Sequence, residues 1–330
     1  MKGKKKIMSN GKILGFVVVL AIGAAASLMM EKKGDTKIHQ AVGSSLLSGE
    51  AIGSIHEMTL REGDESVLLK KGEKGGWSLP REEGFAASAE KVIKLLEGLS
   101  ENKIVRHVSS SKKAWEKLEI KGDKVITLKG DKGFELSLIL GKNRQKGGQY
   151  LAKGGKEDTY LVEKSLLLET KSSAFWYKTL ASLDKDKVKS VVFSDSLQFS
   201  REKKEASFVL KGLKDNEKLK ESEIGRLAGL LSDVSFTGKD KRSQSYNSAL
   251  EKARPLRIET FEGGVFTVKI VRLSVPKGDD KGEFENKYYF YVKGEKATDK
   301  LMDVWQFEIS EYVANNFLKE RRDFVENKSS

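Results

Sequence analysis

The sequence contains no cysteine, only three histidines and only three prolines. The lack of cysteine excludes disulfide bonds, thiolate metal sites, cysteine nucleophiles and a lipid-modified N-terminal cysteine. A folded chain of this composition must be held together by its hydrophobic core, and 330 residues are enough to form one. The low proline content excludes Pro-rich and collagen-like segments, whereas 31 glycines allow many turns.

The net charge is +13, and five lysines stand within the first twelve residues. Elsewhere lysine and glutamate alternate, with no arginine-rich stripe and no nucleic-acid-binding motif, so we expect no nucleic-acid partner. A solvated surface with a basic bias explains this pattern. Attraction to anionic lipid or to acidic envelope polymers is the alternative.

One long apolar run, Ile13 to Met30, carries no charged residue. A helix of this length would rise about 27 Å, close to the thickness of a bilayer core. The lysines before the run favour a cytoplasmic N-terminus. We therefore predict a cytoplasmic basic tail (1–12), a transmembrane signal anchor (13–30) that contacts membrane lipid, and a body on the outer side of the cytoplasmic membrane. A signal peptide cleaved after Ala26 is the alternative.

Beyond a small, polar linker (31–51), the chain shows signs of an internal repeat. Two short stripes of apolar residues have helical spacing, and the second lies 132 residues after the first: Val92, Leu95, Leu96 and Leu99, then Ile224, Leu227, Ala228 and Leu231. An aromatic strand precedes each stripe, around Trp77 and Phe208. We predict a first repeat at 52–187, a second repeat at 188–326 and a tail at 327–330.

Each stripe is followed by a segment in which apolar and polar residues alternate. The alternating apolar positions are Ile126, Phe134, Leu136 and Leu138, then Ile258, Phe266, Val268 and Ile270, again 132 residues apart. A period of two is typical of a half-buried antiparallel sheet. Ser165 and Ser310 are expected to cap helices that close the two copies. The predicted fold class is α+β: an N-terminal transmembrane helix, then two tandem repeats, each a twisted antiparallel sheet with helices packed on one face.

The few residues that could carry chemistry do not form a known motif. Of the three histidines, His39 lies in the linker, and His56 and His107 lie on different predicted strands. The segment from His56 starts like a zinc-protease motif but lacks the second histidine. We therefore predict no metal site.

Glycines and acidic pairs have structural interpretations. The sequences at Gly141-Lys142 and Gly154-Gly155-Lys156 lack the spacing of a phosphate loop and are placed in hairpin turns. Gly225 and Gly229 are expected to allow close packing of a helix on a sheet. Three acidic pairs are placed in solvated loops, because acid–base catalysis needs carboxylates in a cleft: Glu82-Glu83, Glu157-Asp158 and Asp279-Asp280.

The aromatic residues could line a sugar-binding face, but the repeat places Trp77 and Trp305 in the core. Tyr288 and Tyr291 are left open, since they point to opposite faces of a strand. We predict no catalytic, cofactor-binding or metal-binding residue and no cofactor, and the sequence does not identify ligand-binding residues.

The stretch from Val67 to Phe193 resembles a bacterial domain family of unknown function, numbered 4340. The features that carry the resemblance are Trp77-Ser78-Leu79-Pro80 with the Leu-rich helix after it, Trp115 to Leu118, Val125–Leu128, Leu138-Ile139-Leu140-Gly141, Gln149-Tyr150-Leu151 and Tyr160-Leu161-Val162. Similar proteins have an N-terminal membrane helix and often two copies of the domain. This sequence departs from the family at Trp115, where tyrosine is usual, and near Tyr177-Lys178, where arginine is common.

The resemblance implies a partner of a membrane machine, because family members are commonly encoded beside ABC-type transporter components linked to gliding motility and envelope export. We therefore expect a non-catalytic, membrane-anchored accessory or scaffold subunit of an ABC-type complex, with its permease and ATPase subunits as partners. The alternative is an extracytoplasmic binding module for an envelope glycan or an anionic lipid. An enzyme is the third reading.

Overall fold

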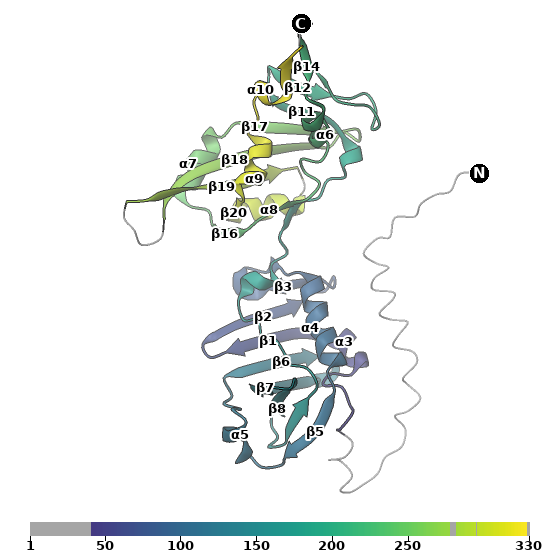
Figure 1. The fold of residues 1–330 in the computed structure, drawn as a ribbon, viewed down its shortest axis with the longest axis vertical. Helices are drawn as coiled ribbons and strands as arrows, with labels where there is room; N and C mark the ends of the chain where they lie inside the picture. The colour runs from purple at the N-terminus through teal and green to yellow at the C-terminus, as the bar shows by residue number, and fades with distance from the viewer. Residues whose placement is uncertain (1–40, 278–281, 295, 329–330) are drawn as a thin grey trace, which may run out of the picture. The chain divides into compact units, whose positions relative to one another are not determined.

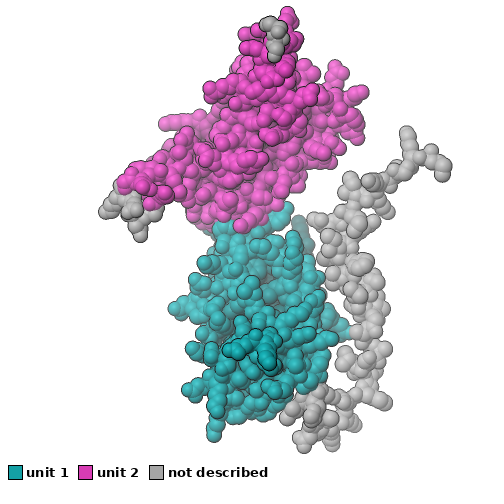
Figure 2. Space-filling model, viewed as in Figure 1, with its two compact units in different colours: residues 1–177 teal, residues 178–330 magenta. Residues whose placement is uncertain are grey.

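The computed structural model describes residues 41–277, 282–294 and 296–328. The chain divides after Tyr177 into two compact units, here called unit 1 and unit 2 (Figure 2). The predicted boundary between the repeats was residue 187. Strand β10 (Thr179–Ala181) pairs with β15 (Val234–Ser235), so the segment before residue 188 belongs to unit 2.

Unit 1 is built on one antiparallel sheet of nine strands (Figure 1). In spatial order these are β4 (Phe85–Ala86), β3 (Trp77–Leu79), β2 (Glu65–Lys71), β1 (Ile55–Glu62), β6 (Lys124–Gly130), β7 (Glu135–Asn143), β8 (Gln149–Lys153), β9 (Thr159–Val162) and β5 (Ile104–Ser109). The helices are α3 (Gly49–Ser54), α4 (Ala89–Glu101) and α5 (Ala114–Lys117), with 3-10 turns at Pro80–Glu82, Asp131–Gly133 and Ser172–Phe175.

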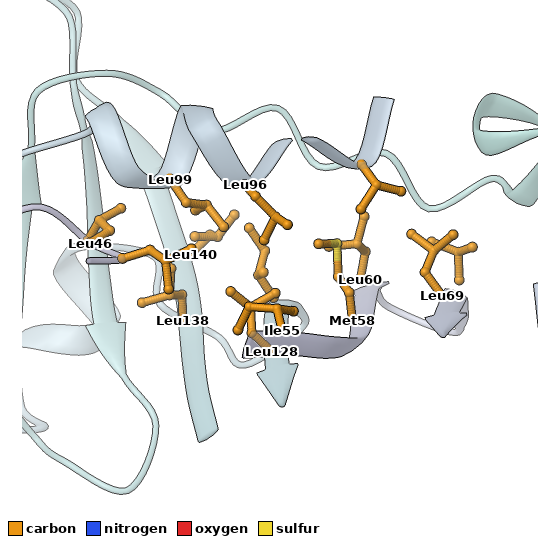
Figure 3. Packing of buried hydrophobic residues seen from close by; sticks show 14 of the residues in the cluster. Leu46, Ile55, Met58, Leu60, Leu69, Leu96, Leu99, Leu128, Leu138 and Leu140 are labelled. Carbon is orange, nitrogen blue, oxygen red and sulfur yellow. The ribbon is translucent and has the colours of Figure 1, made fainter. Parts of the chain in front are cut away.

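Helix α4 forms where the apolar stripe predicts it. Ser88 caps it by accepting a hydrogen bond from the Lys91 amide. Val92, Leu96 and Leu99 are buried against the sheet, which confirms three of the four predicted positions. Figure 3 shows the leucines of this helix pointing towards residues of β1, β6 and β7. The core of unit 1 therefore lies between α4 and one face of the sheet.

Unit 2 is built on an eight-stranded sheet. In spatial order its strands are β13 (Val209–Leu210), β12 (Leu197–Ser200), β11 (Val188–Ser194), β17 (Pro255–Thr260), β18 (Val265–Pro276), β19 (Phe284–Lys293), β20 (Trp305–Ile309) and β16 (Gly238–Lys241). The helices are α6 (Glu221–Leu227), α7 (Gln244–Lys252), α8 (Lys296–Val304), α9 (Glu311–Phe317) and α10 (Arg321–Phe324), with a 3-10 turn at Lys185–Lys187. Strands β14 (Glu217–Leu219) and β21 (Val325–Asn327) form a separate pair.

The sheet of unit 2 is covered on both faces. Phe290 meets Phe317 of α9 on one face, with ring centroids 5.4 Å apart. The neighbouring residue Tyr289 points to the other face, where it packs with Tyr246 of α7. Because adjacent strand residues face opposite sides, α7 and α9 lie on opposite sides of the sheet.

The two sheets have the same strand order. In each, a three-strand meander (β1–β2–β3 or β11–β12–β13) joins a four-strand meander (β6 to β9 or β17 to β20) through its first strand. The far edge is formed by a strand that comes after the helix in the chain, β5 after α4 and β16 after α6 and the short strand β15. Unit 1 adds one short strand, β4, at the opposite edge.

The predicted α+β class is wrong. Strands make up 41% of the described residues and helices 25%, so the fold is mostly β-sheet. The prediction counted a helix after Ser165 that does not form, since the Ser165 hydroxyl instead donates to the Gly148 carbonyl. Ser310 does cap α9, accepting from the Val313 amide. The expectation of helices on one face also fails for α7.

The predicted membrane-spanning segment, 13–30, lies outside the described residues. Across 41–277, 282–294 and 296–328, no helix is long and apolar enough to cross a membrane.

Candidate functional site

A two-stranded arm extends from the sheet of unit 2 (Figure 1). It consists of residues 272–276 of β18 and 284–287 of β19. Strand β17 pairs with β18 only as far as Lys269, and β20 pairs with β19 only from Tyr288 onwards. Among the described residues, the two strands of the arm therefore pair only with each other. Both outer edges of the arm leave backbone N–H and C=O groups without a strand partner.

The arm carries an exposed aromatic residue at its outer end. Phe284 is 64% exposed and lies opposite Pro276. The base of the arm is charged, because Lys287 pairs with Glu308 of β20 at 3.1 Å. The hydrogen bond that Lys287 donates to the Glu308 carboxylate raises the pKa of Lys287. This ion pair ties the base of the arm to the sheet.

Helix α7 supports the root of the arm. Tyr246 and Leu250 of α7 pack with Val271 of β18 and Tyr289 of β19. Tyr246 is fully buried, and its hydroxyl has no hydrogen-bond partner among the described residues. Burial raises the pKa of Tyr246 to about 12. The arm therefore extends from a buried cluster that includes two tyrosines.

A polar cluster lies in unit 1 where β5, β8 and β9 end. His107 Nε2 is 2.9 Å from Asp158 Oδ1 and 3.3 Å from the Ser110 hydroxyl. The hydrogen bond with His107 lowers the pKa of Asp158, with a smaller contribution from Ser110. The His107 ring also packs edge-on against Tyr160, with centroids 5.4 Å apart.

This cluster does not have the geometry of a catalytic triad. In a triad the carboxylate and the hydroxyl contact opposite nitrogens of the imidazole. Here Asp158 and Ser110 contact the same nitrogen, Nε2 of His107. The carboxylate therefore cannot orient the ring for proton transfer from the serine, and the arrangement fixes the ends of β5 and β9 instead.

A lysine without a carboxylate partner stands beside this cluster. Lys153 Nζ lies 5.6 Å from the centre of the Tyr160 ring. Burial lowers the pKa of Lys153, and the nearby Lys156 lowers it further. Within the described part of the chain, no carboxylate is paired with this ammonium group.

Unit 2 has an open depression of about 490 Å³ between α6, α9 and α10. Glu223 stands in it and pairs with Lys319 and with Arg226, the latter at 3.1 Å. Small-molecule sites are usually concave and mostly apolar. This surface is open and charged, with its carboxylate already paired, and resembles a solvated helix junction.

The residues singled out in the sequence are scattered. His39 lies outside the described residues, and His56 is exposed on β1. Trp77 and Trp305 are buried, as predicted. In the ranges that the structure covers, no group of three or more His, Cys, Asp or Glu is placed to hold a metal ion.

Two predictions about individual residues are wrong. A Cβ built at Gly225 would meet nothing within 4 Å, so this glycine does not allow close helix–sheet packing. Asp158 was placed in a solvated loop, but it is half-buried and bonded to His107. Tyr288, which was left open, is buried, and its hydroxyl donates to Glu311 at 3.0 Å.

Sequence reasoning missed Lys153 and the arm. A signal for Lys153 was present, since Gln149, Leu151 and Lys153 alternate along one face of β8. The arm had no such signal, because only the strand pairing shows where β17 and β20 stop.

Comparison with protein families gives one match. The model of a domain of unknown function, DUF4340, matches residues 77–261, more than half of the chain. The match begins in β3 of unit 1 and ends just after β17 of unit 2, so it does not assign one copy to each unit. Neither the curated proteins nor the solved structures contain a match. The chain belongs to the DUF4340 family of domains of unknown function.

Proposed function

We propose that the chain is a non-catalytic accessory subunit of an ABC-type envelope transport or gliding-type complex. In this proposal the apolar segment 13–30 anchors it in the cytoplasmic membrane, with the N-terminus cytoplasmic and both units on the extracytoplasmic side. The single observation that carries the proposal is the arm of unit 2, which offers a surface for a protein partner.

A free two-stranded ribbon is marginally stable in water. Its unpaired edges can each accept an extended segment of another protein by β-strand addition. Phe284 adds an exposed aromatic side chain of the kind that dominates the binding energy of protein interfaces. The partner we propose is the permease of the complex, through an extended extracytoplasmic segment. The ATPase would then be recovered through the permease.

The shared strand order of the two sheets supports a further part of the proposal, that units 1 and 2 are tandem copies of one ancestral domain. Equal order over eight aligned strands is unusual for unrelated sheets, because many orders are possible for this number of strands. On this proposal, the copy that became unit 2 acquired the arm, and the copy that became unit 1 did not.

The test is affinity purification of the full-length protein from membranes in mild detergent, with mass spectrometry of the proteins recovered. We expect an ABC permease and its ATPase. Phe284→Glu should reduce their recovery by about tenfold or more, as for a central interface residue. Val209→Glu is the matched control, because Val209 is 63% exposed on an edge strand of the same unit, and recovery should stay unchanged.

Two results would overturn the proposal. If the wild-type protein is recovered without a permease, the proposed membership of an ABC-type complex is wrong. Equal recovery with Phe284→Glu and Val209→Glu would remove the arm as the contact surface.

A further inference from the structure

Lys153 occupies a position that is apolar in the other sheet. In unit 1, Lys153 lies opposite Leu138 of β7, which lies opposite Ile126 of β6. The corresponding row of unit 2 runs from Val292 of β19 to Val268 of β18 and then to β17. The rows correspond because the strands occur in the same order and the hairpins before them turn at the same step.

The surroundings of this position in unit 2 are closed and apolar. Val292 is 3% exposed, and Phe307 of the neighbouring strand is fully buried. The void beside Val292, which Leu180 and Phe266 also line, has a volume of only about 10 Å³. That is too small for a bound molecule larger than one water. The position of Val292 in unit 2 is therefore part of an ordinary hydrophobic core.

In unit 1 the same place has become polar. Lys153 occupies the position of Val292. Tyr160 occupies the position of Phe307, because Tyr160 pairs with Leu151 as Phe307 pairs with Phe290. A lysine on the core-facing side of a sheet loses hydration and needs an anionic partner. Proteins break the rules of core composition mainly at functional positions.

The protein's own carboxylates do not supply that partner. Asp158 is engaged by His107 and Ser110. The second cation, Lys156, is held near Lys153 by a β-turn in which the Lys156 amide donates to the Lys153 carbonyl at 3.1 Å. Gly155 makes this turn possible with a φ of 74°, a conformation that glycine adopts without strain. The turn thus holds two lysines close together, and Lys156 is near enough to lower the pKa of Lys153, which lies over the buried Tyr160 ring.

We propose that the Lys153–Lys156 turn of unit 1 binds a carboxylate or phosphate group, with Lys153 as the principal contact and Lys156 as the second cation. The ligand class is an anionic group on an envelope molecule, either an acidic sugar or a phospholipid headgroup. The inference does not depend on the arm or on the ABC-type complex, but the choice of envelope molecules rests on the proposed extracytoplasmic location.

The test uses full-length protein in detergent, with lysines dimethylated with ¹³C and observed by NMR. Lys153 is assigned from the signal that is lost in Lys153→Met. We expect this signal to titrate at lower pH than exposed lysines and to shift saturably when inorganic phosphate is added. Sodium chloride at equal ionic strength should not produce the shift.

Variants separate this site from general attraction to a basic protein. Because variants at Lys153 lack the Lys153 signal, their phosphate binding is followed by the signal of Lys156, assigned in the same way from Lys156→Met. Lys153→Met should weaken phosphate binding by about tenfold, the effect of losing one charge-assisted contact. Lys153→Arg should retain it. Lys146→Met, an exposed lysine of the same unit, should have no effect. Absence of a saturable shift, or equal affinity in the Lys153→Met and Lys146→Met variants, would overturn the proposal.

Competition then identifies the source of the anion. Glycerol phosphate that binds more tightly than inorganic phosphate would support a lipid headgroup. Tighter binding of galacturonate would support an acidic polysaccharide. If phosphate, glycerol phosphate and galacturonate all leave the Lys153 signal unmoved, the site does not bind anions and the inference is wrong.

Discussion

Units 1 and 2 share a strand order but place their distinctive features at different points. Unit 1 has the longer helix on its sheet, with 13 residues in α4 against seven in α6, and a polar cluster at one end. Unit 2 has α7 on the opposite face and an arm that extends two of its strands. The strand order therefore sets the frame, while single positions decide which surface each unit presents.

One glycine shows how such a position works. In unit 1, a Cβ at Gly141 of β7 would lie 2.5 Å from the Leu118 carbonyl oxygen. That carbonyl also accepts a hydrogen bond from the Lys142 amide at 2.9 Å, so the chain crosses β7 here. The corresponding residue of unit 2 is Val271, where the strand continues into the arm. Glycine therefore lets the segment at Leu118 pack across β7 in unit 1, at the position where β18 of unit 2 continues into the arm.

The largest predicted effect comes from moving the lysine between the units. Val292→Lys should destabilise unit 2 by about 3–5 kcal/mol, because an ammonium would be buried without a partner. The reverse change, Lys153→Val, should stabilise unit 1 by up to about 1 kcal/mol, because it removes a desolvated charge. Hydrogen exchange measured by mass spectrometry reports the two units separately.

Val292→Ala controls for the loss of packing alone. If Val292→Lys costs no more than Val292→Ala, the position in unit 2 is not enclosed, and the contrast between the two sheets fails at this point.

A glycine pair gives an intermediate effect. Gly141→Ala should destabilise unit 1 by about 1–3 kcal/mol, because the added methyl group meets the Leu118 carbonyl. Gly225→Ala in α6 should stabilise unit 2 by about 0.5–1 kcal/mol, because the site is open and alanine favours helix. Urea unfolding of each variant measures both changes. A neutral Gly141→Ala would mean that the 118–120 segment moves aside freely.

The smallest effect concerns pH and the polar cluster of unit 1. The pKa of Asp158 is lowered in the folded state, chiefly by the hydrogen bond with His107. Its contribution to stability is therefore present above the unfolded carboxyl pKa of about 3.9 and is lost as the pH falls through the lower folded pKa. The pair is partly exposed, so the contribution should be below about 1 kcal/mol.

Asp158→Asn tests this contribution. At pH 6 the variant should unfold at a slightly lower urea concentration than the wild type, and by about pH 2 the difference should vanish. A difference that persists unchanged at pH 2 would show that the loss comes from altered packing of the loop and not from the charge.

The apolar stripes were sufficient to place α4 and the order of the hairpins, because burial has a clear period. They placed the second helix only in part, since α6 ends at Leu227, before Ala228 and Leu231. They were not sufficient to set the register. Ile126 lies opposite Leu138, but Ile258 lies opposite Phe266, so the alignment at 132 residues is displaced by two. A slip of two residues keeps every side chain on its face, and alternation alone cannot detect it.

The fold class and the polar cluster could not be predicted from the sequence, because both depend on contacts between residues far apart in the chain. The helix expected after Ser165 depended on a local cap, and the tertiary contact with Gly148 takes that hydroxyl instead. Likewise, nothing in the local sequence pairs Asp158 with His107, since the pairing of β5 with β9 brings them together. Lys153 stands out only against the strand pairing of both sheets, which places it in the row that is apolar in unit 2.

The order of strands also has a consequence for how the chain folds. In each sheet the first strand lies in the middle. One of its two neighbours comes only after the intervening helix in the chain: β6 pairs with β1, and β17 pairs with β11. Such non-local pairing slows folding, because a long loop must close before the contact forms. During synthesis each early hairpin therefore exposes an open strand edge, and this is the stage at which we expect the protein to need protection from aggregation.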